Sequence, residues 1–248
     1  MAHAHASERR VGVLVPDSNI VHEFEFAKLR PEGVRFGFRP FGFPAADAAD
    51  YCADLAALMA EPAKDLKDWG AEVILIGCTT ASMKCGQPEH IARMEQIAGV
   101  PIVTAASAVR EAITALKLKS LTIATPYGDR SNGIVSNFIK GCGADVSAIA
   151  GFAYDANPTM FKEKATTLTP REVIKFISDI DTPTADGMFL PCTGVRSVET
   201  LAQLEKDRGK VAISSVSAGF WAALRRIGFD GRQVGYGRLL STWDFAKA

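Results

Sequence analysis

The stretch Val73-Ile-Leu-Ile-Gly-Cys78-Thr-Thr80 joins a short apolar run to a cysteine and two threonines. A second stretch, Met188-Phe-Leu-Pro-Cys192-Thr-Gly194, repeats this pattern 114 residues later. Runs that are apolar throughout are typical of strands buried on both faces of a parallel sheet. We therefore expect each cysteine to lie at the carboxyl end of such a strand, the edge at which open α/β sheets bind ligands.

Similar apolar runs alternate with longer helical patterns along the whole chain, which predicts the α/β class. The expected strands are Val11–Val15, Val73–Ile76, Pro101–Val103, Leu121–Ala124, Met188–Leu190 and Val211–Ile213. The expected helices include Ala45–Trp69, Ala106–Leu116, Asn132–Gly141, Pro170–Ile180, Ser197–Asp207 and Ala218–Ile227.

The chain also resembles itself at a fixed offset. Val11–Pro16 aligns with Leu121–Pro126, and Ile102–Ala108 aligns with Ala212–Ala218, both 110 residues apart. Such a repeat predicts two similar α/β domains related by pseudo-two-fold symmetry, each with a parallel sheet flanked by helices. The alternative is the ordinary likeness among α/β units.

Composition narrows the function classes. The 248 residues carry 28 Lys+Arg and 28 Asp+Glu, so the basic surplus that phosphate recognition needs is absent and nucleic acid is not an expected partner. A hydrophobic fraction of 48% with 23% charged residues is typical of a folded protein. Because the apolar runs are strand-sized, we expect neither a membrane span nor a signal peptide. We interpret residues 1–9 as a tag or disordered start.

The five cysteines are an odd number without CxxC spacing, which predicts free thiols and a cytoplasmic location. We expect Cys52 and Cys142 to be small buried hydrophobes and Cys85 to be structural. Cys78 and Cys192 instead predict a functional pair, because both end equivalent strands. The backbone N–H groups of the turns after them suit a carboxylate. The same groups should lower the thiol pKa below its usual value of about 8.5.

Other chemistries find little support. Outside the first residues, only His22 and His90 are available to a Ser-His-Asp triad, and no GxSxG motif occurs. Histidines and cysteines do not cluster at zinc-ligand spacing. Gly141-Cys-Gly143 is too short for a dinucleotide loop, and there is no P-loop. We therefore expect neither a metal nor a cofactor.

Further polar residues follow the first strand of each expected half. Asn19 and Ser18 come after Pro16, and Tyr127 follows Thr125-Pro126 at the equivalent place of the repeat. Both segments leave a strand at a proline and present polar groups to the cysteine edge, although a solvated turn would also explain them. Asn157 is a further candidate for the same cleft.

From about residue 10 to residue 245, the chain resembles the aspartate/glutamate racemase superfamily, and within it maleate cis-trans isomerase and arylmalonate decarboxylase. The paired cysteine strand ends are the main carrier of this resemblance. Val13-Leu-Val-Pro-Asp-Ser-Asn19 and Thr125-Pro-Tyr127 resemble the isomerase. Ser214-Ser-Val-Ser-Ala-Gly-Phe-Trp221 and Gly235-Tyr-Gly-Arg-Leu-Leu240 resemble the decarboxylase, which has glycine in place of the first cysteine.

The resemblance implies a cofactor-independent enzyme that acts on a small carboxylic acid. As a maleate isomerase, it would add the Cys78 thiolate to the double bond and use Cys192 to protonate and later deprotonate the neighbouring carbon. Asn19 and Tyr127 would hold one carboxylate. The other carboxylate would be held by hydroxyl and backbone N–H groups. The expected binding residues are Asn19, Ser18, Thr79, Thr80, Tyr127, Asn157, Thr193 and Gly194.

Three alternatives stay open at this point. A substituted-malonate decarboxylase would need only Cys192 as proton donor. An amino-acid racemase would use both thiols, and Asp17 is the candidate to hold the ammonium group. A non-catalytic carboxylate-binding protein would show no thiol dependence.

The resemblance also implies that the chain crosses between its halves. The expected first domain comprises residues 10–106 and 217–248, and the second comprises residues 107–216. Relatives are often homodimers, so a homodimer is a further expectation. The candidates to line the substrate pocket, whether small or aryl-sized, are Phe24, Phe43 and Tyr51.

Overall fold

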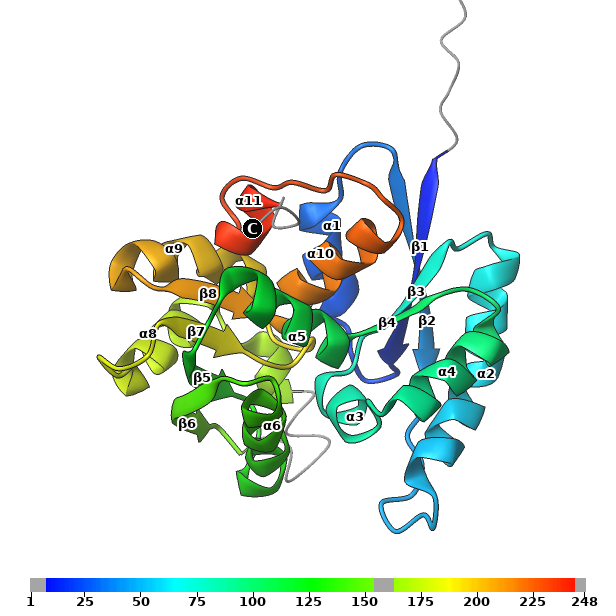
Figure 1. The fold of residues 1–248 in the computed structure, drawn as a ribbon, viewed down its shortest axis with the longest axis horizontal. Helices are drawn as coiled ribbons and strands as arrows, with labels where there is room; N and C mark the ends of the chain where they lie inside the picture. The colour runs from blue at the N-terminus through cyan, green and yellow to red at the C-terminus, as the bar shows by residue number, and fades with distance from the viewer. Residues whose placement is uncertain (1–7, 154–162, 244–248) are drawn as a thin grey trace, which may run out of the picture.

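Two four-stranded parallel sheets form the frame of the molecule (Figure 1). The computed structural model describes residues 8–153 and 163–243. The strand orders are β2-β1-β3-β4 and β6-β5-β7-β8, so the second sheet repeats the first. This arrangement confirms the predicted α/β class with two similar halves. The strands are β1 (Arg9–Pro16), β2 (Val34–Phe41), β3 (Val73–Ile76), β4 (Ile102–Thr104), β5 (Ser120–Thr125), β6 (Asp145–Gly151), β7 (Gly187–Leu190) and β8 (Val211–Ser214).

The sequence prediction missed two strands, β2 and β6, and both lie at a sheet edge. In β2 only Val34 and Phe41 are buried, and no residue of β6 is fully buried. A search for continuous apolar runs finds strands covered on both faces and passes over these half-exposed ones.

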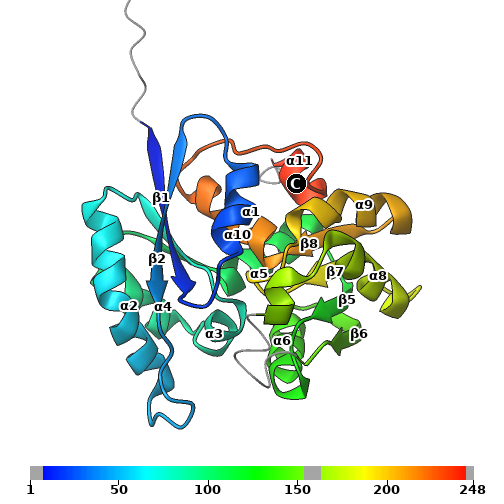
Figure 2. The same cartoon turned by 180° about the vertical axis from the view of Figure 1, so that it is seen from behind.

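Helices cover the faces of both sheets (Figure 2). The predicted helix from Ala45 begins at Tyr51 instead, because the Asp50 carboxylate accepts a hydrogen bond from Ala53 N at 3.0 Å and caps the helix there. The helices are α1 (His22–Leu29), α2 (Tyr51–Asp68), α3 (Thr79–Lys84), α4 (Pro88–Ala98), α5 (Ala105–Leu116), α6 (Asp129–Gly141), α8 (Pro170–Ile180), α9 (Val198–Arg208), α10 (Ser215–Arg226), α11 (Arg238–Thr242) and the 3-10 turn η2 (Ala165–Thr167).

The internal repeat extends to individual hydrogen bonds. Both α5 and α10 begin with a capping box, in which a hydroxyl before the helix and a serine at its third residue bond each other's backbone N–H. In each half a helix glutamate also accepts the backbone N–H of a residue seven positions later. All three positions are separated by 110 residues, as the sequence alignment predicts. The two sets are Thr104, Ser107 and Glu95, and Ser214, Ser217 and Glu205.

Helices α5 and α10 pack against each other between the two sheets (Figure 1). Residues 215–224 of α10 are all buried, and Gly219 lets this helix approach β3, since a Cβ there would lie 3.0 Å from Leu75 Cδ2. Helix α10 also contacts α1 and β4 of the first half. These contacts support the proposed return of the chain after residue 217, while the domain limits stay a prediction.

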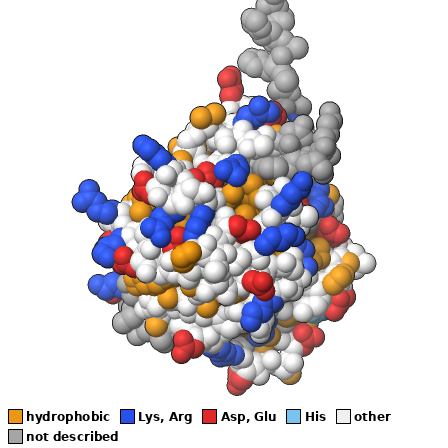
Figure 3. Space-filling model, turned by 60° about the vertical axis from the view of Figure 1, so that its left-hand side comes forward, with side chains coloured by type: hydrophobic (Ala, Val, Ile, Leu, Met, Phe, Trp, Pro, Cys, Tyr) orange, Lys and Arg blue, Asp and Glu red, His pale blue; other side chains and the backbone are white. Residues whose placement is uncertain are grey.

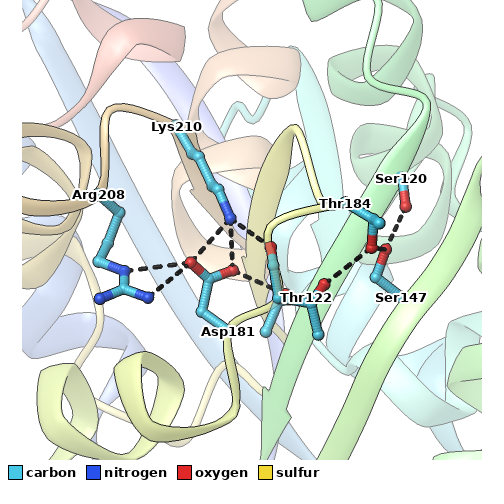
Figure 4. A network of polar contacts seen from close by, with 8 residues as sticks. Ser120, Thr122, Ser147, Asp181, Thr184, Arg208 and Lys210 are labelled. Atoms are coloured by element: carbon cyan, nitrogen blue, oxygen red, sulfur yellow. Dashed lines mark hydrogen bonds and ion pairs between the residues drawn. The ribbon is translucent and has the colours of Figure 1, made fainter.

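A polar network lies near the amino ends of the second sheet's strands (Figure 4). The Asp181 carboxylate, whose side chain is 2% exposed, accepts bonds from Lys210, Arg208 and Thr122. Burial raises the pKa of Asp181, but these hydrogen bonds outweigh it and leave the pKa below its usual value. The network is structural, because it lies at the end of this sheet opposite Cys192, which follows the carboxyl end of β7.

Charges of both signs are interspersed on the face shown in Figure 3, in keeping with the neutral composition. Among the described residues, no helix is long and apolar enough to cross a membrane.

Candidate active site

Cys78 and Cys192 line the same cavity of about 340 Å³, which we call the thiol cleft. Cys78 is the cap residue between β3 and α3, and Cys192 lies two residues beyond the end of β7. Both side chains are buried, and both retain thiols. The two halves of the repeat thus bring their strand ends to one cleft, as expected for a pair of cooperating sulfur atoms.

The environment of Cys78 corrects one prediction. The Thr80 hydroxyl and the backbone N–H groups of Thr80 and Ala81 bond the Cys78 sulfur and favour its thiolate form. Burial outweighs them and raises the pKa of Cys78 to about 11, whereas the sequence had suggested a lowered pKa. In the substrate-free cleft, the protonated thiol is therefore the main form at neutral pH.

Cys192 occupies an unusual backbone conformation, with φ at +84°. A side chain in this left-handed region is strained by about 1–3 kcal/mol and persists only where its surroundings hold it. Here Cys192 N donates to the Thr79 hydroxyl at 3.2 Å, and Gly194 N donates to the Cys192 sulfur at 3.3 Å. One of these bonds holds the Cys192 backbone and the other holds its sulfur, so the position of the thiol in the cleft is fixed.

Thr193 joins three strand ends from the two halves. Its hydroxyl donates to Gly77 O at 2.7 Å and accepts from Asn19 Nδ2 at 2.9 Å. The other end of the Asn19 amide, Oδ1, accepts from the backbone N–H groups of Val21 and His22 at the start of α1. Asn19 is therefore held at both ends, with its amide nitrogen directed toward the second half.

Tyr127 interacts with both thiols. Its hydroxyl is hydrogen-bonded to Cys192 and Thr79 and is close to Cys78. Burial, together with the proximity of both sulfurs, raises the pKa of Tyr127 well above its usual value, so the phenol stays protonated and can donate. Thr125 places the residue, because its hydroxyl accepts from Tyr127 N at 3.0 Å.

Nearly all the sequence-predicted binding residues line the thiol cleft. This holds for Asn19, Ser18, Thr79, Thr80, Tyr127, Thr193 and Gly194. Asn157 lies outside the described residues. Phe43 also lines the cleft, and Tyr51 lines the cavity beside it. Phe24 lines neither and instead lies on the surface of α1 beneath the cations of Lys28 and Arg196.

Sequence reasoning missed three residues around the cleft. Ser131 lines it, and the buried Ser215 accepts a hydrogen bond from the Thr79 hydroxyl at 2.8 Å. His22 packs against the strand end before Cys78, where a Cβ on Gly77 would lie 2.5 Å from the imidazole. Burial lowers the pKa of His22 to about 3, so the ring is neutral. The serine-rich start of α10 could have indicated Ser215, whereas no sequence pattern indicates that His22 packs on Gly77.

Two cysteines are not thiols, contrary to prediction. Cys52 in the first turn of α2 and Cys85 at the end of α3 form a disulfide, with their Cα atoms 5.5 Å apart. Their separation of 33 residues matches no short motif, so only the tertiary fold brings them together. The disulfide removes the basis for predicting five free thiols, and with it the cysteine argument for the cytoplasm.

No group of three or more His, Cys, Asp or Glu side chains in the described ranges could hold a metal ion. The groups that line the cleft are two thiols, a phenol, several hydroxyls, the Asn19 amide, the Asp17 carboxylate and backbone N–H groups. One thiol can add to an activated carbon while the other transfers a proton at the adjacent carbon. The hydroxyl and N–H donors can hold carboxylates.

Residues 11–240 match the family model described as arylmalonate decarboxylase. The chain belongs to the arylmalonate decarboxylase family. This match spans both sheets and the whole cleft, and it confirms the resemblance recognised from the cysteine strand ends.

The curated relatives of this chain include enzymes with two different activities. The chain is 26% identical to arylmalonate decarboxylase from Bordetella bronchiseptica, covering 94% of this chain and 97% of that protein. It is likewise 26% identical to maleate isomerase from Pseudomonas putida, with the same coverage. The relatives thus include a decarboxylase and an isomerase, as the resemblance implied.

A solved structure of the same fold is that of Nocardia farcinica maleate cis-trans isomerase, a cysteine-to-serine mutant with a covalently bound succinylcysteine intermediate. Its TM-score is 0.80 at 22% identity, and the alignment covers 94% of this chain and 98% of that one. The likeness confirms the two-domain fold of this family member.

Proposed function

We propose that this protein is a cofactor-independent isomerase that converts a cis-enedioate of the maleate class to its trans isomer. The observation that carries the proposal is the pair of buried thiols in one cleft, together with a protonated Tyr127 that interacts with both. In this proposal Cys78 is the nucleophile and Cys192 is the acid and base. The succinylcysteine of the Nocardia isomerase supports the same chemistry on this fold.

The reaction is balanced without an added oxidant or reductant. The Cys78 thiolate forms a bond to one alkene carbon, and the π electrons move to the neighbouring carbon and its carboxylate. Cys192 delivers a proton to that carbon, which leaves a succinyl thioether with a rotatable single bond. After rotation, the Cys192 thiolate removes a proton, the C–S bond breaks and its electrons return to Cys78.

The carboxylates have separate donors on the two sides of the cleft. Asn19 Nδ2 has two hydrogens, of which one donates to Thr193, so a second can reach a carboxylate. Tyr127 adds a phenol donor, and the turns after Cys78 and Cys192 supply backbone N–H groups. These donors would stabilise the negative charge that develops beside the protonated carbon.

A raised thiol pKa sets a condition on this mechanism. Because the pKa of Cys78 is about 11, only a small fraction of the substrate-free enzyme carries a thiolate at neutral pH. Addition proceeds from that fraction, which the Thr80 hydroxyl and the N–H groups of Thr80 and Ala81 stabilise. The rate of isomerisation should therefore increase with pH.

The second candidate is decarboxylation of a substituted malonate. The equal identities to the decarboxylase and to the isomerase support it. In that reaction Cys192 alone would protonate the enediolate left after loss of carbon dioxide, and Cys78 would be dispensable. A racemase would require both thiols but no double bond. A homodimer and a cytoplasmic location stay predictions.

Proton NMR in D₂O tests the proposal directly, with maleate, phenylmalonate and α-substituted acids as separate substrates. We expect fumarate from maleate, and loss of this activity in Cys78→Ala and in Cys192→Ala. Cys142→Ala is the matched control, because Cys142 is a thiol outside the cleft. Decarboxylation of phenylmalonate that survives Cys78→Ala would instead establish the second candidate. Exchange of an α-proton alone would indicate a racemase.

A further inference from the structure

A second cavity of about 520 Å³ adjoins the thiol cleft, and we call it the outer chamber. Phe43, Thr80 and Ser131 line both cavities, so the two lie side by side. Pockets for drug-sized ligands measure about 300–1,000 Å³, and the thiol cleft alone reaches that range. A four-carbon diacid would therefore leave the outer chamber empty. The chamber's other lining residues include Tyr51, Ala81, Lys84, Asp129, Arg130 and Ile134.

The outer chamber has an excess of positive charge. Lys84 and Arg130 face it, against one acidic side chain, that of Asp129. Lys84 Nζ lies 3.5 Å from the centre of the Tyr51 ring, a cation–π contact that fixes the ammonium group at the chamber wall. Neither Lys84 nor Arg130 forms an ion pair with a carboxylate of the described residues.

The charge lies within reach of the reacting thiol. Helix α3 begins directly after Cys78 and ends at Lys84. At about 1.5 Å per residue, these six residues correspond to about 9 Å along the helix. Thr80 links the thiol to the outer chamber, since its hydroxyl bonds the Cys78 sulfur and the residue also lines the chamber. The Lys84 side chain and a carboxymethyl branch on the alkene would bridge this separation together, each from its own end.

We propose that the outer chamber is a third carboxylate subsite, with Lys84 as its specificity-determining residue. The preferred substrate is then a cis-enedioate whose 2-substituent ends in a carboxylate, a tricarboxylic acid of the cis-aconitate type. This inference rests on the isomerase function and names the substrate class of the same cleft. The two core carboxylates occupy the thiol cleft, while the third pairs with Lys84 beside Arg130.

Kinetic discrimination between two branched substrates tests this subsite. The measured quantity is the ratio of kcat/KM for cis-aconitate to that for 2-methylmaleate, whose branch is neutral. We expect Lys84→Met to lower this ratio by about tenfold, because a hydrogen-bonded charge pair is lost while the side-chain stem remains. Lys84→Arg should retain most of the ratio. Asp129→Asn is the matched control of opposite sign and should raise it.

Ionic strength gives a second readout. The ratio of the wild-type enzyme should fall as salt is added, because the chamber is open to solvent and its charges are screened. A ratio that does not change in Lys84→Met and is insensitive to salt would overturn the subsite, even with maleate isomerised as proposed.

Binding of unreactive acids separates this inference from the isomerase function. Calorimetry would compare propane-1,2,3-tricarboxylate with 2-methylsuccinate on the wild-type protein and on Lys84→Met. Tighter binding of the tricarboxylate that is lost in the variant would support the subsite, even if no cis-enedioate were turned over. Equal binding of the two acids, or an advantage that survives Lys84→Met, would contradict it.

Discussion

Cys78 shows why the candidate residues could be predicted from sequence and the state of their protons could not. An apolar run followed by Cys-Thr-Thr places a thiol at a strand end, beside hydroxyl and N–H donors, and the structure has it there. The sequence does not show how deeply that strand end is covered. Because burial outweighs the donors, the pKa rises rather than falls.

The backbone conformation of Cys192 differs from that of Cys78, its counterpart in the other half, and this difference also depends on tertiary contacts. Cys78 has an extended backbone and leads straight into α3, whereas Cys192 has φ at +84° and leads into a turn. The repeat predicts that both thiols face one cleft. It cannot predict the left-handed backbone, which depends on the bond from Cys192 N to the Thr79 hydroxyl of the other half.

The pH dependence of Cys78 alkylation is a prediction at this scale. A group with a pKa of about 11 gains thiolate by about tenfold for each pH unit below that value. Modification of Cys78 by iodoacetamide, followed by peptide mass spectrometry, should therefore accelerate continuously from pH 7 to pH 10. A rate that levels off at or below pH 8.5 would show that the N–H donors outweigh burial.

At the scale of elements, a contact between α1 and α9 holds the turn that carries Cys192. The buried Glu25 of α1 accepts from Ser197 N at 2.7 Å and Val198 N at 2.8 Å, and so caps α9. Burial raises the pKa of Glu25, while these backbone bonds oppose the shift. Glu25 and Ser197 are 172 residues apart, so no local sequence pattern predicts this cap.

We expect Glu25→Ala to lower both stability and turnover. Two buried N–H donors would lose their acceptor, at a cost of about 1–3 kcal/mol each in the free energy of unfolding. A displaced turn would also misplace the Cys192 sulfur, and shifts of that kind lower rates by about 100-fold. Urea unfolding and kcat measured well below the unfolding transition separate the two effects.

Lys28→Ala is the matched control for this element. Lys28 also joins α1 to α9, through an ion pair with Glu199, but the pair lies at the surface. Such pairs contribute about 0–1 kcal/mol. Equal effects of Glu25→Ala and Lys28→Ala on kcat would contradict a positioning role of Glu25.

At the scale of the whole molecule, the 110-residue repeat predicted most of the architecture. It matched β1 with β5 and β4 with β8, together with the equivalent starts of α5 and α10. The edge strands β2 and β6 escaped, because their residues are only partly buried. The pairing of Cys52 with Cys85 also escaped, because the two residues lie 33 positions apart and meet only in the tertiary fold.

The disulfide gives a prediction for overall stability. Cross-linking residues 33 positions apart restricts the unfolded chain, so Cys52→Ala with Cys85→Ala should lower the free energy of unfolding by about 2–4 kcal/mol. A reductant should shift the urea midpoint of the wild type in the same direction and leave that of the double variant unchanged. Titration of the denatured protein without reductant should find three thiols. Five thiols and an unchanged midpoint would rule the disulfide out.

The central claim is that Cys78 attacks the substrate while Cys192 moves the proton, and trapping the covalent intermediate tests it most directly. Cys192→Ser would be incubated with maleate, denatured in acid and examined by intact and peptide mass spectrometry. The account predicts a mass increase of one maleic acid, located on Cys78, and no such species in Cys78→Ala with Cys192→Ser. An adduct on Cys142, or no adduct under conditions where the wild type forms fumarate, would contradict it.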